Sequence, residues 1–178
     1  LDIVVPNAGI NGVLAPIEDI TPEEWDQTQN INVRGTFLTV KYAIPHLRAA
    51  GGGSIVVVSS VNGNRIFSNF GFTSYSCSKA AQVTFAKMAA VELAQWAIRI
   101  NVVCPGWTKT SIGENTFARD IDKIKIPREY PEGMVPLQQR PASSEEVANV
   151  ILFLASNEAS YVTGTEIYVD GALSLFQG

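Results

Sequence analysis

The chain has 178 residues, 46% of them hydrophobic and 17% charged, with a net charge of −4. This composition predicts one folded domain with a sizeable core and excludes a disordered chain. The negative charge argues against nucleic acid or an anionic membrane as a partner, and no apolar run reaches the roughly 20 residues of a membrane span. The two cysteines, Cys77 and Cys104, belong to no Cys/His cluster, so we expect small packing roles for them, no metal site and a cytoplasmic location.

Four short, largely β-branched apolar runs predict β-strands at residues 1–5, 53–59, 99–104 and 166–170. They are apolar at nearly every position, which is typical of a sheet covered on both faces. The chain opens directly on the first run, LDIVV. Because domains rarely begin inside a strand, we expect this chain to be part of a longer one.

Helical patterns separate the strands. The first helix begins at the N-cap Thr21, with Pro22 at its first position and Glu24 completing a capping box, and it must end before the glycines at 51–53. A second, alanine-rich helix runs from about 74 to 96, and a third follows Ser143. Strands alternating with helices predict a parallel α/β sheet with right-handed crossovers. The apolar residues of the first helix that keep to helical spacing are Trp25, Ile31, Phe37, Leu38, Ile44 and Leu47.

Residues 108–142 follow no regular pattern and contain four prolines, Pro127, Pro131, Pro136 and Pro141. Such a long irregular stretch inside a compact domain is usually a lid or a binding loop. We therefore expect these residues to border a substrate site.

Ligands of open parallel sheets bind at the carboxyl ends of the strands. Here the strands are followed by small or polar residues, namely Asn7, Ala8 and Gly9, then Ser59 and Ser60, then Pro105 and Gly106. Any one of these turns has an ordinary structural explanation, since βα turns need such residues. Three together favour a ligand site at this edge.

The stretch TSYSCSKAA places Tyr75 and Lys79 four positions apart, on one face of the second helix. A phenol has a pKa near ~10, and a nearby ammonium favours its charged form. The spacing predicts that Lys79 lowers the pKa of Tyr75, which would make Tyr75 a usable general acid and base. The pair alone is a weak signal, because it occurs by chance in many helices.

The order of several motifs is more specific. The chain resembles the C-terminal part of a short-chain dehydrogenase/reductase over nearly its whole length, in NAG (7–9), NVRGTF (32–37), SIVVVSS (54–60), YSCSK (75–79), RINVVCPGWTKT (99–110), PLQQRPASSEEVANVILFLAS (136–156) and VTGTEIYVDG (162–171). The resemblance implies a doubly wound Rossmann-like sheet that here lacks its first three strand–helix units. It also implies hydride transfer between NAD or NADP and a secondary alcohol or ketone.

The same resemblance implies the roles of individual residues. Tyr75 would be the general acid and base, Lys79 would also bind the nicotinamide ribose, Ser60 would orient the carbonyl, and Asn32 would join a proton relay through water to Lys79. The cofactor would be contacted by Asn7, Ala8, Gly9, Tyr75, Lys79, Pro105, Gly106, Thr108 and Thr110. A homodimer or homotetramer is expected, through the tail at 169–178 and through helix residues Phe37, Tyr42, Phe85, Ala89, Ala90, Leu93, Ala94 and Trp96.

Three departures qualify the resemblance. The glycine-rich phosphate loop is absent, Pro6 stands where asparagine is usual, and the stretch between Ser60 and Tyr75 is slightly long. Phe67, Phe70 and Phe72 in that stretch could line an apolar pocket or pack under the loop.

Without the missing half, the strand LDIVV would be an exposed edge. Ser59 is a rival of Ser60 for the carbonyl. Two other functions stay open: a truncated, non-catalytic oligomerising relative, and a lyase-type relative that uses no nicotinamide. Lys79 argues against the lyase, because relatives of that type tend to carry arginine there.

Overall fold

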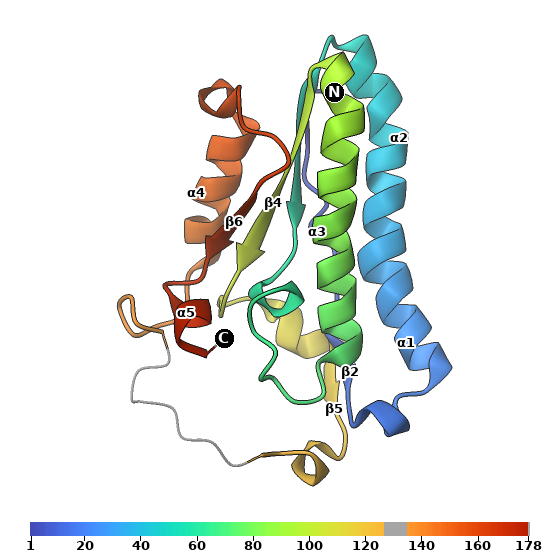
Figure 1. Cartoon of the computed structure of the whole chain (residues 1–178), viewed down its shortest axis with the longest axis vertical. Helices are drawn as coiled ribbons and strands as arrows, with labels where there is room; N and C mark the ends of the chain where they lie inside the picture. Colours follow the sequence, from blue (N-terminus) through green and yellow to red (C-terminus); the bar gives the residue numbers. More distant parts are fainter. Residues whose placement is uncertain (127–134, 178) are drawn as a thin grey trace.

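The computed structural model describes residues 1–126 and 135–177. Its main sheet has four parallel strands in the order β1–β3–β4–β6 (Figure 1). This confirms the predicted parallel α/β sheet. The strands are β1 (Ile3–Val4), β3 (Gly53–Val58), β4 (Ile98–Pro105) and β6 (Glu166–Val169).

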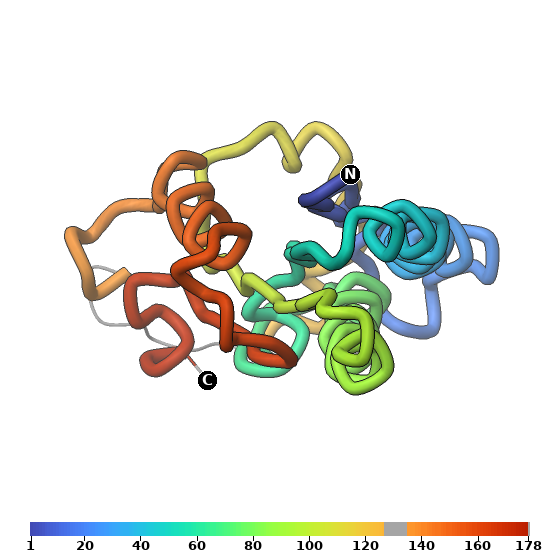
Figure 2. The backbone as a smooth tube through the Cα atoms, turned by 90° about the horizontal axis from the view of Figure 1, so that it is seen from above, coloured from blue at the N-terminus to red at the C-terminus, as the bar shows by residue number. Residues whose placement is uncertain are grey.

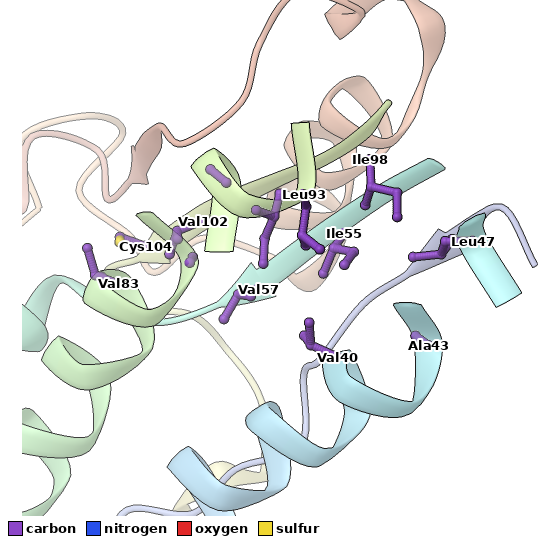
Figure 3. Close-up of a cluster of buried hydrophobic side chains, with 13 residues drawn as sticks. Val40, Ala43, Leu47, Ile55, Val57, Val83, Leu93, Ile98, Val102 and Cys104 are labelled. Carbon is purple, nitrogen blue, oxygen red and sulfur yellow. The ribbon is translucent and has the colours of Figure 1, made fainter. Parts of the chain in front are cut away.

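Helices cover both faces of this sheet, as the continuous apolar strands predict (Figures 1 and 2). Helices α2 (Gly35–Ala49) and α3 (Thr73–Leu93) pack on one face, and α4 (Ser144–Ala155) packs on the other. Along β3, Ile55 and Val57 face the α2–α3 side, whereas Val56 faces α4. Figure 3 shows the larger cluster, in which side chains from both helices meet β3 and β4.

The predicted first helix has three parts. It consists of α1 (Pro22–Gln29), a π turn (Asn30–Arg34) and α2, which follow one another directly. The capping box of Thr21 and Glu24 is confirmed. The expected apolar face is only partly correct, since Ile31 and Phe37 are exposed. The residues buried along these three parts are polar toward the N-terminal end and apolar toward the C-terminal end: Thr28, Asn32, Thr36, Val40, Ala43 and Leu47.

The remaining helices follow the prediction closely. Helix α3 continues into a 3₁₀ turn (Ala94–Trp96), and α4 starts at the predicted N-cap Ser143, whose capping box with Glu146 is complete. Ala90 and Leu93 pack in the core of this chain, which corrects their expected place in an oligomer interface. The chain closes with α5 (Leu173–Gln177), and the other 3₁₀ turns are Ile17–Asp19, Val61–Gly63, Ser111–Asn115, Ile121–Lys123 and Asn157–Ala159.

The irregular segment 108–142 contains a strand that the sequence pattern did not reveal. Here β5 (Thr116–Ala118) pairs in parallel with β2 (Gly12–Leu14) in a small second sheet. Each strand has only three residues, too few for a periodic signal. Pro127 and Pro131 of this segment lie outside the described residues.

Two arginines of this segment bind the glutamates of the two capping boxes. Arg119 donates to both carboxylate oxygens of Glu24, at 2.7 and 2.9 Å. Arg140 donates to both oxygens of Glu146, at 2.8 Å each. Hydrogen bonds from these guanidinium groups lower the pKa of each glutamate from 4.5 to about 2. The segment is therefore fastened to the N-termini of α1 and α4.

Strand β1 is an edge of the main sheet within the described residues; its residue Ile3 and the flanking Leu1 and Val5 are exposed. An apolar edge was the expectation for LDIVV. Pro6 has no backbone donor, yet its carbonyl accepts the Val58 N–H at 3.1 Å and so extends the pairing. None of the helices among the described residues has the length and apolar character needed to cross a bilayer.

Candidate active site

The carboxyl ends of β1, β3 and β4 border one cavity of about 920 Å³. This is the edge at which the sequence predicts a ligand. The cavity wall contains all but one of the predicted site residues, namely Asn7, Ala8, Gly9, Ser60, Tyr75, Lys79, Pro105, Gly106, Thr108 and Thr110. Asn32 is not part of the wall, because it is fully buried behind it.

Tyr75 and Lys79 share one face of α3, as their spacing predicts. Both are buried, with 7% and 3% of their surface exposed. The Lys79 ammonium lies 5.6 Å from the centre of the Tyr75 ring and donates a hydrogen bond to the Val58 carbonyl at 3.1 Å. Phe72 packs edge-on against the Tyr75 ring at 5.8 Å. The Lys79 ammonium is therefore close to the Tyr75 ring, and both side chains are largely shielded from solvent.

The pKa of Tyr75 differs from the prediction made for it. Burial raises the pKa above its usual value of 10, and a hydrogen bond with Ser60 opposes the rise. The expected lowering by Lys79 does not occur in the chain alone. Burial also lowers the pKa of Lys79 from 10.5 to about 8. Burial is the largest cause of both pKa shifts, and the spacing of the two residues in the sequence does not reveal it.

Ser59 and Ser60 have different partners. The Ser59 hydroxyl donates to the Lys79 carbonyl at 2.8 Å and so ties β3 to α3. The Ser60 hydroxyl accepts the Asn62 N–H at 3.2 Å and is hydrogen-bonded to the Tyr75 phenol. Ser60 is therefore the serine that meets Tyr75, which agrees with the preference from the sequence.

Asn32 occupies the middle of the π turn, and its side chain holds the chain after β1. Its Oδ1 accepts the Ile10 N–H at 2.9 Å, and its Nδ2 donates to the Ile10 carbonyl and to Ser78, each at 2.9 Å. Its own carbonyl accepts from Thr36 and Gln82. Most of its hydrogen-bonding capacity therefore serves the packing of the turn.

Gly9 separates the cavity from Asn32. A Cβ atom at Gly9 would lie 3.2 Å from Asn32 Oδ1 and 3.5 Å from Lys79 Nζ. The missing side chain therefore leaves space between these two groups. Asn32 is also connected to the wall residue Tyr75 through Ser78, whose hydroxyl accepts from Asn32 and donates to the Tyr75 carbonyl.

Gly106 lines the cavity and also packs closely against Asp170. A Cβ at Gly106 would lie 2.7 Å from Asp170 Cβ, so the absence of a side chain makes room for Asp170. Asp170 in turn accepts the N–H groups of Ala172 and Ser174, at 3.1 and 2.9 Å. These bonds fix α5, which brings Leu173 and Gln177 into the cavity wall.

Several wall residues were not found from the sequence. Leu173 and Gln177 belong to the tail that the family resemblance placed in an oligomer interface. Their place in the cavity wall becomes visible only with the hydrogen bonds that Asp170 accepts. Of the three phenylalanines, Phe72 lines the cavity while Phe67 is exposed.

The two cysteines also differ. Cys104 is buried and burial raises its pKa to about 12, whereas Cys77 is exposed, contrary to its expected packing role.

The cavity suits the nicotinamide end of a dinucleotide in its chemistry. It offers a buried ammonium at Lys79, the hydroxyls of Thr108 and Thr110, and open space beside Gly9. Thr108 donates to the Gly106 carbonyl at 3.2 Å, and Thr110 accepts the Ile112 N–H at 3.4 Å. Pyrophosphate is normally held by a glycine-rich turn before a helix, and the sequence contains no such turn.

A parallel sheet has helices on both faces, and Ser60, Tyr75 and Lys79 lie around a cavity at its carboxyl edge, which is an arrangement of the Rossmann-like class. The profile of the family described as "Enoyl-(Acyl carrier protein) reductase" matches residues 1–174. The chain belongs to the short-chain dehydrogenase/reductase family.

Named relatives agree with this assignment. The chain is 37% identical to dehydrogenase/reductase SDR family member 4 of Sus scrofa, covering 96% of this chain and 58% of that protein. It is 41% identical to the 3-oxoacyl-[acyl-carrier-protein] reductase FabG of Thermotoga maritima, covering 97% of this chain and 66% of that protein. The chain thus spans less than two thirds of the length of these relatives.

Solved structures agree in fold. A 3-ketoacyl-ACP reductase from Sinorhizobium meliloti 1021 superposes with a TM-score of 0.92 at 48% identity, covering 98% of this chain and 69% of that one. Levodione reductase superposes with a TM-score of 0.83 at 32% identity, covering 98% and 67%.

Proposed function

We propose that this chain carries the catalytic part of an NAD- or NADP-dependent oxidoreductase that acts on a secondary alcohol or ketone. The observation that carries the proposal is that Ser60, Tyr75 and the buried Lys79 line the wall of one cavity. A hydroxyl donor next to a phenol is the pair that a carbonyl oxygen needs when it becomes an alkoxide.

In the reductive direction, Tyr75 gives its proton to the substrate oxygen while Ser60 donates a hydrogen bond to the same oxygen. The raised pKa keeps the phenol protonated at neutral pH, which is the form that reduction consumes. In the oxidative direction Tyr75 accepts the alcohol proton. Bound NAD(P) supplies or accepts the hydride.

Lys79 has two proposed roles. Its ammonium holds the ribose hydroxyls of the cofactor, and it stabilises the phenolate that Tyr75 becomes after proton transfer. Asn32 and Gly9 bound the space beside Lys79, and we assign to this space the water that returns a proton to the site. Asn7, Ala8, Pro105, Thr108 and Thr110 would contact the cofactor from the other sides of the cavity.

A non-catalytic relative would have no use for this arrangement. Burial that lowers the pKa of Lys79 to about 8 disfavours its charged form and so costs stability at neutral pH. A scaffold gains nothing from that cost, whereas perturbed groups in a cavity are typical of catalytic sites. The oligomer and the cytoplasmic location predicted from the sequence belong to the same proposal.

The test is Tyr75→Phe in the complete protein. The ring keeps its packing against Phe72, so the melting temperature should stay within a few degrees of wild type. Turnover of ketones with NAD(P)H should fall by roughly 10² to 10⁴-fold, since the proton donor is lost. A variant with near wild-type turnover would refute the mechanism. Ser59→Ala is the matched control, because that hydroxyl is bonded to the Lys79 carbonyl and not to Tyr75.

A further inference from the structure

Two asparagines form a polar pair in the cavity wall that the proposed mechanism does not use. Asn62 lies in the 3₁₀ turn Val61–Gly63, directly after Ser60, and Asn69 lies a few residues before Phe72. Both line the cavity with Ser60 and Tyr75. The Asn69 Nδ2 donates to the Asn62 Oδ1 at 2.9 Å. The pair therefore joins the two arms of the loop across the wall.

Each primary amide offers two N–H groups and one carbonyl oxygen. The bond between the pair uses one N–H of Asn69 and the oxygen of Asn62. Within the described residues, the Asn62 NH₂ group and the Asn69 oxygen bond to no protein atom. Exchanging oxygen and nitrogen in both amides gives the same outcome, with one NH₂ group and one oxygen left over. The wall thus presents a donor and an acceptor in either orientation.

The position of the pair relative to the reacting oxygen is fixed by the backbone. The Asn62 N–H donates to the Ser60 hydroxyl at 3.2 Å, so the turn that carries the amide also orients the serine. The neighbouring wall is apolar, through Ile66, Phe72 and Leu173. A ligand that meets Ser60 therefore finds one further polar contact nearby and apolar surface around it.

We propose that the amide pair of Asn62 and Asn69 selects substrates with a second oxygen, as a carbonyl or hydroxyl on a carbon close to the reacting one. The inference rests on the proposed function and narrows its substrate class. A substrate with this oxygen replaces water on the amides when it binds. A simple ketone leaves donor and acceptor desolvated without a partner, which costs binding free energy.

The experiment compares two ketones of equal chain length in the complete protein. Ethyl 3-oxobutanoate carries the second oxygen, and heptan-2-one does not. In the reduction, a hydride from NAD(P)H adds to the keto carbon and one proton adds to its oxygen, so each ketone becomes the corresponding alcohol and the dinucleotide is oxidised. The ratio of kcat/KM for the two ketones is measured in wild type, Asn62→Leu and Asn69→Leu. Differences in intrinsic reactivity cancel when the ratios are compared between variants.

We expect each leucine variant to lower kcat/KM for the oxo ester about tenfold or more, as expected for a lost hydrogen bond. The value for heptan-2-one should stay the same or rise, because leucine removes an amide that this ketone leaves without a partner. Asn115→Leu is the matched control, because it removes an amide from another part of the same wall. An equal loss for both ketones, or no loss for either, would overturn the inference.

Binding separates this inference from the proposed function. The affinity for ethyl 3-hydroxybutanoate is measured by calorimetry with the dinucleotide bound, and heptan-2-ol serves as the reference ligand. If the protein turns over neither ketone, the proposed function fails, yet a loss of ester affinity confined to the Asn62 and Asn69 variants would still support the amide site. An affinity for the ester that does not depend on these residues would refute the site, whatever the turnover.

Discussion

Lys79 is the residue at which function and stability oppose each other most directly. It is 3% exposed, and its pKa is lowered from 10.5 to about 8 by burial. Below pH 8 the lysine is charged in both the folded and the unfolded protein, so the folded state bears the full desolvation cost. Between pH 8 and 10.5 the folded protein loses the proton first, and the cost disappears.

We therefore predict that Lys79→Met stabilises the complete protein at pH 7. The relief is on the order of 3 kcal/mol. The lost hydrogen bond to Val58 offsets about 1 kcal/mol of it. Urea unfolding at pH 7 and at pH 10 measures the effect, and the gain should shrink at the higher pH. Turnover should be lost at both values. A variant less stable than wild type at pH 7 would contradict the assigned pKa.

A substitution at Gly9 tests whether the space between Asn32 and Lys79 is needed for turnover. Its backbone is not among those with positive φ, so alanine can adopt it, but the new Cβ would lie 3.2 Å from Asn32 Oδ1 and 3.5 Å from Lys79 Nζ. We predict that Gly9→Ala lowers kcat about tenfold or more, because small displacements of catalytic groups are costly. The melting temperature should change little. Ala148→Val, in another part of the same wall, is the control, and unchanged kcat in Gly9→Ala would show that the space is not used.

The sequence predicts the candidate site residues better than their surroundings. Tyr75 and Lys79 can be paired from helical geometry alone, whereas the choice of Ser60 over Ser59 needs the spacing from Tyr75 and the family resemblance. The pKa of Tyr75 cannot be predicted in this way, because its burial depends on how neighbours such as Phe72 pack against the ring in the folded chain. The pairing of Asn62 with Asn69 depends on a loop conformation that has no periodic pattern.

Among the elements, the salt bridge of Arg119 with Glu24 joins β5 to the start of α1. The pKa of Glu24 is lowered to about 2, so this contact contributes stability above pH 4.5 and loses it as the pH falls toward 2. We predict that Arg119→Gln moves the pKa of Glu24 upward toward 4.5 and flattens the loss of stability in this window. NMR titration of the Glu24 carboxylate and thermal unfolding at pH 3 to 5 measure both effects.

Arg140→Gln is the matched control for this experiment, since it breaks the equivalent bond to Glu146 and leaves Glu24 unchanged. Hydrogen exchange in residues 116–118 should rise only in the Arg119 variant. If the Glu24 titration is the same in both variants, the guanidinium is not the cause of the lowered pKa.

The strands and helices with strong local signals could be predicted, and those that depend on distant contacts could not. Both capping boxes and the parallel strands follow from residue types and spacing. Strands β2 and β5 lie about a hundred residues apart and become strands only through each other. The π turn could not be predicted either. The residues buried around it, Thr28, Asn32 and Thr36, are polar, so the spacing of apolar residues does not mark this face as the buried one.

For the molecule as a whole, the outer side of α2 and α3 exposes several large apolar side chains. Phe37 and Phe85 contact each other edge-on at 6.4 Å across the two helices. Met88 and Val91 are 72% and 83% exposed on α3, and Tyr42 is exposed on α2. Apolar side chains gathered in this way usually mark a protein interface. The expected homo-oligomer would cover them.

We predict that the complete protein is a dimer or tetramer and that Val91→Glu shifts it toward smaller species. A charge buried in the interface would be unpaired and costly. Sedimentation velocity measures the change. Ile17→Glu is the control, since Ile17 is also an exposed apolar residue but lies in the 3₁₀ turn Ile17–Asp19 before α1. A stable wild-type monomer would refute the interface.

The π turn at Asn30–Arg34 also sets the angular phase between α1 and α2. A π turn holds about one residue more than an α-helical turn, and each α-helical residue advances the direction of the side chains by about 100°. Deleting one residue here would leave a regular helix but swing the whole of α2 about its axis. Val40, Ala43 and Leu47 would then leave the sheet. A length change of one residue, harmless in most surface loops, would here rotate the buried face of a 15-residue helix by about 100°.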